Sequence, residues 1–460
     1  MDLAGELIGL GALAVREVTL FAAVGFITLG IGDLAVDLIW LGMSVKRIVR
    51  RAPAASVDSL AAPQRPGRLV LFVPAWQEAE VIGPMLRHAL GRIDHGDYLI
   101  YVGCYPNDPA TIAAVDAVAD PRVRSVIGAR DGPSTKADNL NRLWERLLAD
   151  EAADGWQAKA IVLHDAEDVV HSAELKLFDS LIERFDLVQL PVLPLIDERS
   201  RWIAGHYADE FAEAHGKEMV VRAALGAGLP SAGVGCAIAR EALEALAERG
   251  GGEPFDSASL TEDYELGLRL RAMGRRAAFL RLPAGAGSPA VATREHFPST
   301  LDAAVSQKAR WMAGIALSGW DRLGWSGGLA ERWMRLRDRQ SLLAALLLCA
   351  AYFVLLTAAP LAAVATATGH EAVLLTPTIE VLTAVAMLLL LWRLAMRFAF
   401  VTGAYGWREG LRALPRVLVG NAIAMLAARR AVARYLHARR TGRSDWDKTS
   451  HVFPTQLPAE

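Results

Sequence analysis

The chain has 460 residues, of which 53% are hydrophobic and 22% are charged, and its mean hydropathy is +0.25. Its 49 basic and 51 acidic side chains give a net charge of −2, which argues against nucleic acid as a partner, because phosphate binding needs a basic surface. The three cysteines, Cys104, Cys236 and Cys349, are too widely spaced for a disulfide framework or a zinc motif, so a disulfide-stapled secreted protein is excluded and a reducing compartment is favoured.

The N-terminal region, residues 1–51, predicts a transmembrane helix over about 18–43, which is long enough to cross roughly 30 Å of hydrocarbon. This segment carries Asp33 and Asp37 on one helical face, so the two carboxylates either face neighbouring helices or line a polar transport path. A basic flank follows and predicts that residue 46 onward lies in the cytoplasm. Residues 52–68 are rich in proline, alanine and serine and are typical of a linker.

Residues 69–300 alternate short apolar runs with amphipathic segments. Five runs predict buried strands: RLVLFVPA, YLIYVGCY, VRSVIG, KAIVLHDAED and FDLVQLPV. Strands that alternate with helices predict an α/β fold with a mostly parallel sheet, whose ligands bind at the carboxyl ends of the strands.

The C-terminal part becomes apolar again. Residues 301–340 are rich in arginine and tryptophan and predict interfacial helices, and residues 341–398 predict two further transmembrane helices. For residues 399–460 we expect an interfacial or re-entrant helix and a cytoplasmic tail, because both flanks are basic and the apolar run is interrupted by Pro415, Gly420 and Asn421. The sequence therefore predicts three spans, with the soluble domain and the C-terminus on the cytoplasmic side.

The acidic segment HDAED, residues 164–168, directly follows an apolar run that predicts a strand. Adjacent carboxylates at a strand end repel one another unless a cation lies between them, which suits a hard ion such as Mg²⁺ or Mn²⁺. The alternative is a solvated acidic loop.

Three other segments leave two interpretations open. Thr261, Glu262 and Asp263 form either a capped helix start with acidic residues favoured by the dipole or the site of a general base. The run from Gln307 to Trp311 suits either phosphate and sugar contacts or a helix at the membrane surface. Lys136 follows a turn that either cradles a phosphate or caps a helix.

Taken in order over one α/β domain, these segments give the chain a resemblance to the membrane-integrated, processive-type family 2 glycosyltransferases. The local sequence resembles the bacteriophage-adsorption protein B group in YPNDPAT, DGPSTKADNLN, HDAEDVVH, QKARWMAGIALSGW and WDKTSHVFP. The resemblance covers roughly residues 69–320 and the C-terminal tail, and QxxRW after TED is its most specific part.

The resemblance implies a GT-A fold, a nucleotide-sugar donor and a divalent cation, Mg²⁺ or Mn²⁺. By position, Asp165 and Glu167 match the metal and diphosphate site, and Asp263 matches the catalytic base. Asp168 is an additional carboxylate without an assigned role. The acceptor and diphosphate positions are Glu262, Gln307, Arg310 and Trp311, and the nucleotide positions are Glu78, Asp108 and Lys136.

One departure concerns the end of the second strand, where the family often has Asp-Asp-Gly and this chain has Gly103-Cys104-Tyr105, which leaves the nucleobase undetermined. The function expected is an inverting, metal-dependent transferase that moves a sugar, taken as that of a UDP-sugar, to a growing exported glycan at the bacterial inner membrane. Few spans suggest that a homo-oligomer or a secretion or outer-membrane partner completes an export path. The alternatives are transfer of a single sugar to a lipid acceptor and a non-catalytic receptor or assembly scaffold.

Overall fold

The computed structural model describes residues 3–51, 55–441 and 452–454. The start of the expected linker (52–54) and most of the segment WDKTSHVFP, together with the rest of the expected tail, lie outside the described residues.

A seven-stranded sheet forms the core of the soluble domain, with the strand order β3-β2-β1-β4-β6-β5-β7. Only β6 runs antiparallel to its neighbours, β4 and β5. The strands are β1 Leu69–Pro74, β2 Tyr98–Cys104, β3 Val123–Ile127, β4 Ala160–Leu163, β5 Leu187–Gln189, β6 Cys236–Ala239 and β7 Ala277–Phe279. The predicted α/β class with a mostly parallel sheet is confirmed, and β1 to β5 are the five strands that the apolar runs predict.

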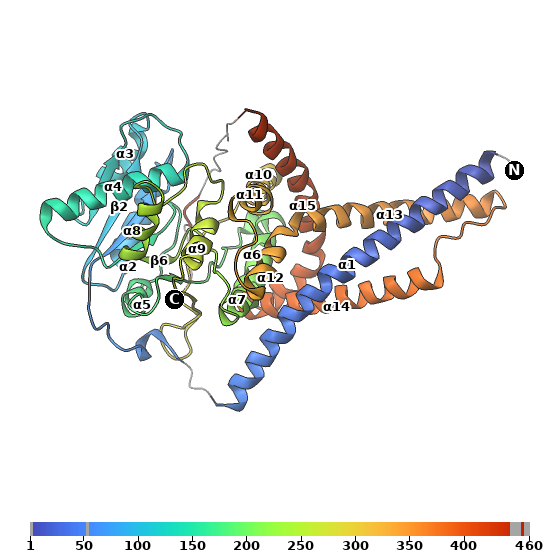
Figure 1. The fold of residues 1–460 in the computed structure, drawn as a ribbon, viewed down its shortest axis with the longest axis horizontal. Helices are drawn as coiled ribbons and strands as arrows, with labels where there is room; N and C mark the ends of the chain where they lie inside the picture. The colour runs from blue at the N-terminus through green and yellow to red at the C-terminus, as the bar shows by residue number, and fades with distance from the viewer. Residues whose placement is uncertain (1–2, 52–54, 442–451, 455–460) are drawn as a thin grey trace.

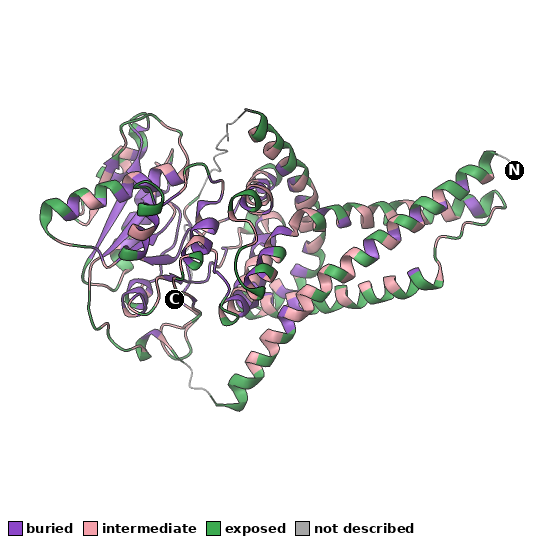
Figure 2. Cartoon of the chain, viewed as in Figure 1, coloured by how far each residue is buried: buried purple, intermediate pink, exposed green. Residues whose placement is uncertain are grey.

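Helices cover both faces of this sheet, and most of its residues are buried except in the edge strand β3 (Figure 2). On one face the apolar core includes residues of α2 Ile82–Arg92, α3 Pro109–Asp116 and α5 Glu174–Leu181. On the other face it includes residues of α4 Lys136–Asp154, α8 Arg240–Arg249 and α9 Glu262–Ala272. The carboxyl ends of the parallel strands β1, β2 and β4 are thereby left free to carry loops.

Three long helices, α1 Leu3–Val49, α13 Ser341–Ala367 and α14 Pro377–Tyr405, run side by side away from the soluble domain (Figure 1). α15, Trp407–Thr441, crosses between this bundle and the soluble domain. All four are long and apolar enough to cross a membrane. α1 is much longer than the 18–43 segment that hydropathy predicts, and α14 begins after an irregular connection and continues beyond the apolar run.

The expected interruption of the last apolar segment is not observed, because α15 is one continuous helix with Pro415 inside it. Proline removes one helical hydrogen bond, but tertiary contacts offset this loss. The side chain of Arg416 is fully buried and forms ion pairs with Asp209 at 3.1 Å and with Glu409 at 2.9 Å. An interfacial placement of α15 remains a prediction, which its course across the ends of α13 and α14 beside the soluble domain supports (Figure 1).

Short helices connect the sheet domain to the long helices. They are η1 Val57–Ser59, η2 Glu198–Ser200, α6 Ile203–Glu213, η3 Ala214–Glu218, α7 Met219–Ala224, α10 Leu301–Met312, η4 Ala313–Ser318, α11 Gly319–Leu323 and α12 Leu329–Arg339. α10, η4 and α11 follow one another without a break, and only Gln340 separates α12 from α13.

The two carboxylates of α1 face other elements of the protein. Asp37 forms an ion pair with Lys217 of η3 and accepts a hydrogen bond from Trp392 of α14 at 2.8 Å. Asp33 pairs with Arg337 of α12 at 3.0 Å and also with Arg393 of α14. This arrangement supports the helix-facing interpretation of the pair, and it fastens α1 to both the soluble domain and α14.

Candidate active site

A buried histidine between two carboxylates shapes the acidic loop that follows β4. His164 is fully buried, and its Nδ1 and Nε2 each lie 2.7 Å from an oxygen, of Asp168 and Glu174 respectively. Burial alone would lower the pKa of His164, but the two carboxylates raise it to about 10. The ring is therefore an imidazolium at neutral pH and donates both hydrogen bonds.

The structure assigns a role to Asp168, for which the sequence offered none. Its Oδ2 accepts the bond from His164 and also a hydrogen bond from the backbone N–H of Asp165 at 3.0 Å. Asp168 thus holds the turn whose first residue is Asp165. The side chain of Asp165 remains 30% exposed and forms an ion pair with Lys136, which begins α4.

Several carboxylates gather at this loop. Glu167 is buried, and Glu295 lies close enough that burial and the charges of Asp168, Glu167 and Asp165 raise its pKa well above the usual range. The segment of Glu295 lies beside the loop because the backbone N–H of Val169 donates to the carbonyl of Arg294 at 2.7 Å. A cluster of carboxylates of this kind fits a divalent cation. Within the described parts of the chain, no three His, Cys, Asp or Glu side chains form a complete metal site by themselves.

The start of α9 brings two further carboxylates to the same place. Burial, reinforced by the charge of Asp263, raises the pKa of Glu262 to about 7. Burial also raises the pKa of Asp263, against the opposing charges of Lys136 and Arg310. Lys136 therefore acts on both Asp165 and Asp263, which joins the β4 loop and the α9 start into one electrostatic unit.

Two QxxRW residues of α10 have different surroundings: Arg310 lies beside this electrostatic unit, and Trp311 packs against other aromatic side chains. Arg310 lies near enough to lower the pKa of both Glu262 and Asp263. The Trp311 ring packs in an aromatic cluster, with its centroid 6.0 Å from Tyr207 and 6.4 Å from Phe297. Its predicted contact with the acceptor, like that of Gln307, remains a prediction.

Contact between α9 and the helix after QxxRW depends on Gly314 in η4. A Cβ atom at Gly314 would lie 2.5 Å from Cγ2 and 2.6 Å from Oγ1 of Thr261, which is too close. We expect Gly314→Ala to cost about 1–3 kcal/mol of unfolding free energy and to lower turnover, because η4 must move away from the α9 start. Denaturant unfolding and a turnover assay measure both effects.

Gly420→Ala is the matched control for this substitution. Gly420 also lies in a helix, but no atom lies within 4 Å of a Cβ added there. Its substitution should leave turnover unchanged and should not destabilise the protein, since alanine favours the helix. Equal behaviour of the two variants would contradict a close α9–η4 contact.

The predicted nucleotide positions Glu78 and Asp108 lie together beside the ends of β1 and β2. Asp108 caps α3: Oδ1 accepts from the N–H of Thr111 at 3.3 Å, and Oδ2 accepts from the N–H of Gln77 at 2.5 Å. The N–H of Glu78 donates to Oγ1 of Thr111 at 2.9 Å. Both oxygens of Asp108 thus support the loop backbone, and a nucleotide contact of either carboxylate remains a prediction.

Gly103, Cys104 and Tyr105 occupy the place where the family often has Asp-Asp-Gly. Tyr105 is buried, its ring lies 5.0 Å from that of Trp76 in an edge-on arrangement, and Arg142 lies over it at 4.3 Å. Gly103 is required here by packing, because a Cβ would lie 1.8 Å from Oδ1 of Asn139. The departure from the family pattern is therefore accommodated by a specific local packing.

Comparison with known proteins gives consistent results. Residues 66–314 match the family described as glycosyltransferase like family 2. The chain is 37% identical over 477 aligned residues to the bacteriophage adsorption protein B of Escherichia coli (strain K12) and to the bacteriophage N4 adsorption protein B of Escherichia coli O157:H7. These alignments cover 96% of this chain but 62% of each relative, so the chain spans less than two thirds of their length.

Solved glycosyltransferases show more distant similarity. The mannosyltransferase PcManGT from Pyrobaculum calidifontis, in complex with GDP-Man and Mn²⁺, is 18% identical with a TM-score of 0.48, covering 88% of this chain and 99% of its own. The glucosyl-3-phosphoglycerate synthase from Mycobacterium tuberculosis, in complex with Mn²⁺ and UDP-glucose, is 16% identical with a TM-score of 0.34. The match covers 60% of this chain and 86% of the synthase. The family match extends over more than half of the chain, and this chain therefore belongs to the family described as glycosyltransferase like family 2.

Proposed function

We propose that this protein is an inverting, metal-dependent glycosyltransferase that moves a sugar from a nucleotide-sugar to a growing exported glycan at the cytoplasmic face of the bacterial inner membrane. The observation that carries the proposal is the electrostatic unit in which Lys136 acts on Asp165, Glu262 and Asp263 together. Inversion needs three elements at one place, namely a cation site, a base and a positive charge for the leaving diphosphate.

The donor diphosphate is proposed to bind between Lys136, Arg310 and the acidic loop. Asp165 and Glu167 would hold the divalent cation, and donor oxygens would complete its coordination. When bound, the cation neutralises negative charge on the diphosphate as it leaves. Lys136 then contributes positive charge from the start of α4, where its ion pair with Asp165 already holds it. The relatives solved with Mn²⁺ make Mn²⁺ a suitable first ion to test.

Transfer is proposed to occur in one displacement. The acceptor hydroxyl oxygen bonds to the anomeric carbon of the sugar while the bond from that carbon to the diphosphate oxygen breaks with its electron pair. Asp263 takes the proton of the hydroxyl, and burial, by raising the pKa of this carboxyl, makes it a stronger base than a solvated aspartate. Glu262 and Asp263 interact, so their two carboxyl groups titrate as a pair.

The pH dependence of turnover follows from these raised pKa values. The base Asp263 must be ionised, and burial raises its pKa, so kcat/KM should rise with increasing pH at values above the ordinary pKa of an aspartate and should fall at lower pH. Lys136 lowers the pKa of Asp263, so Lys136→Gln should move this rise to higher pH. Lys176→Gln, which changes a half-exposed lysine of α5, should leave it in place. A rise near pH 4 in the wild type would contradict the assignment.

The membrane arrangement supports an exported product. Apolar residues of the distal parts of α1, α13 and α14 face outward (Figure 2), as expected for a lipid environment. The soluble domain and the basic residues that follow α1 lie at the same end of the bundle, which suits a cytoplasmic catalytic domain. A homo-oligomer or a secretion partner would complete an export path.

Donor turnover by the detergent-purified full chain tests the proposal. UDP-, GDP- and dTDP-sugars are offered with Mn²⁺ or Mg²⁺, and released nucleotide is measured. Release from one donor that depends on the cation is the expected result. No cation-dependent release from any donor, with added acceptor glycan or polyprenyl phosphate, would contradict the proposal. Release only with the lipid acceptor would favour single-sugar transfer.

A further inference from the structure

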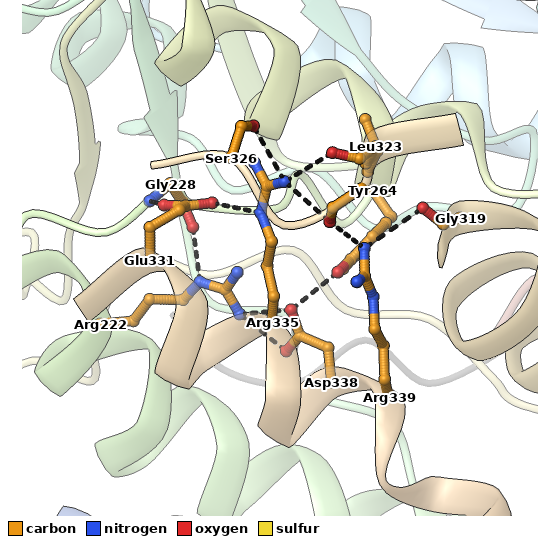
Figure 3. Close-up of polar contacts among 11 residues, drawn as sticks. Arg222, Gly228, Tyr264, Gly319, Leu323, Ser326, Glu331, Arg335, Asp338 and Arg339 are labelled. Atoms are coloured by element: carbon orange, nitrogen blue, oxygen red, sulfur yellow. Dashed lines mark hydrogen bonds and ion pairs between the residues drawn. The ribbon is translucent and has the colours of Figure 1, made fainter. Parts of the chain in front are cut away.

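A polar network on α12 joins the membrane helices to both motif-bearing helices of the site. Four side chains on one side of α12, namely Glu331, Arg335, Asp338 and Arg339, form what we call the α12 contact face. Arg335 lies four residues after Glu331, and Asp338 and Arg339 lie three and four residues after Arg335, so all four lie toward one side of the helix. Figure 3 shows them pointing toward α7, the start of α9 and the loop after α11.

Asp338 makes the contact with α9. Its Oδ2 accepts a hydrogen bond from Tyr264 Oη at 2.7 Å, and Tyr264 is the residue directly after Asp263. Both oxygens of Asp338 also accept from Nη1 of Arg222, at 2.7 and 3.0 Å. Arg222 is buried, and its Nε donates to the carbonyl of Gly228. Asp338 therefore binds Arg222 of α7 and Tyr264 of α9 at the same time (Figure 3).

The two arginines of the α12 contact face hold the helix that carries QxxRW. Arg335 donates to the carbonyls of Leu323 at 2.8 Å and Gly324 at 3.2 Å, which end α11. Arg339 donates to the carbonyl of Gly324 at 2.8 Å and lies over the Trp325 ring at 4.4 Å. Cations near the C-terminus of a helix stabilise its free carbonyl groups. Since α10, η4 and α11 are continuous, these bonds fix the C-terminal end of the helical segment that carries QxxRW.

We infer that Asp338 is a positioning residue of the transfer reaction, acting through Tyr264 on the place of Asp263 relative to Arg310. α12 binds the α9 start and the end of the QxxRW helix at the same time, so it sets the distance between them. Only Gln340 lies between α12 and α13, so this distance is also tied to a membrane helix. The inference rests on the proposed function of Asp263 as the base.

Tyr264→Phe tests the inference, because it removes only the hydroxyl group that Asp338 accepts from. We expect kcat to fall roughly tenfold, as loss of a hydrogen bond to a buried charge implies, while KM for the donor stays unchanged. Tyr101→Phe is the matched control, since Tyr101 is buried and donates at 2.5 Å to Asp150, which lies near the opposite end of α4 from Lys136. It should lower stability and leave kcat unchanged.

A double-mutant cycle shows whether Tyr264 acts through Asp338. The kcat of Tyr264→Phe combined with Asp338→Ala should equal that of Asp338→Ala alone. Additive losses would overturn the inference, as would a kcat for Tyr264→Phe equal to that of Tyr101→Phe. If Asp338→Ala does not fold, the split between kcat and KM in Tyr264→Phe decides the question.

Hydrogen exchange separates this inference from the proposed function. In Tyr264→Phe the amides of the first turn of α9 should exchange faster than in the wild type, while those of β1 and β4 should not change. Wild-type protein without turnover on any donor would contradict the proposed function, yet this exchange difference would still show that Asp338 positions α9. Unchanged exchange at the α9 start would overturn the positioning role.

Discussion

Asp263→Asn should lower turnover by roughly 10²–10⁴-fold, because the amide cannot accept the proton of the acceptor hydroxyl. The substitution keeps the shape of the side chain, and its Oδ1 can still accept the hydrogen bond that the N–H of Tyr264 donates at 2.7 Å. Donor binding should therefore remain close to that of the wild type. Released nucleotide and the binding of a nucleoside diphosphate with Mn²⁺ measure the two quantities separately.

Asp302→Asn provides the control for this prediction. Asp302 also lies in the first turn of a helix, α10, but its side chain is 90% exposed and pairs with Arg430 at the surface. Its substitution should leave turnover unchanged. Turnover of Asp263→Asn comparable to that of Asp302→Asn would remove Asp263 from the mechanism and direct attention to Glu262 as the base.

Asp165→Ala should abolish the Mn²⁺-dependent binding of a nucleoside diphosphate. One of the two proposed cation ligands is lost, and Lys136 loses the partner of its ion pair. The freed lysine should still attract phosphate, so weak binding that does not depend on Mn²⁺ is expected to remain. Titration calorimetry with UDP or GDP, with and without Mn²⁺, distinguishes the two kinds of binding.

The control for Asp165 is an aspartate at the opposite edge of the sheet. Asp97 directly precedes β2, is about half exposed and pairs with Arg68 at 2.7 Å. Asp97→Ala should bind the nucleotide with full Mn²⁺ dependence. Retention of that dependence in Asp165→Ala would show that the cation is held elsewhere.

The strands that the sequence could predict are those with long apolar runs. β1 and β2 have six and seven residues and are recognisable for that reason. β6 and β7, with four and three residues, contain mostly alanine and carry no periodic signal, so they escaped prediction. Their place in the sheet depends on pairing with β5, a contact between distant parts of the chain.

The site was predictable where a motif marks it and not where only tertiary contacts create it. Lys136, Asp165 and Asp263 come together as their motifs implied. Glu295 carries no motif and reaches the acidic loop only because its segment pairs with the backbone beside Val169. Asp338 lies in an arginine-rich helix that resembles a membrane-surface segment, and its bond to Tyr264 cannot be read from composition.

The ion pairs of α1 join it to residues that are translated much later than α1 itself. Asp37 pairs with Lys217, 180 residues later, and Asp33 pairs first with Arg337 and then with Arg393, 360 residues later. At about 5–20 residues per second, a ribosome needs roughly 10–70 s to supply these partners. Before Lys217 and Arg337 are made, α1 carries two carboxylates that still lack these partners, which hydrocarbon disfavours. α1 packs against α14 and therefore reaches its final position only after α14 has been made, although α1 is translated well before α14.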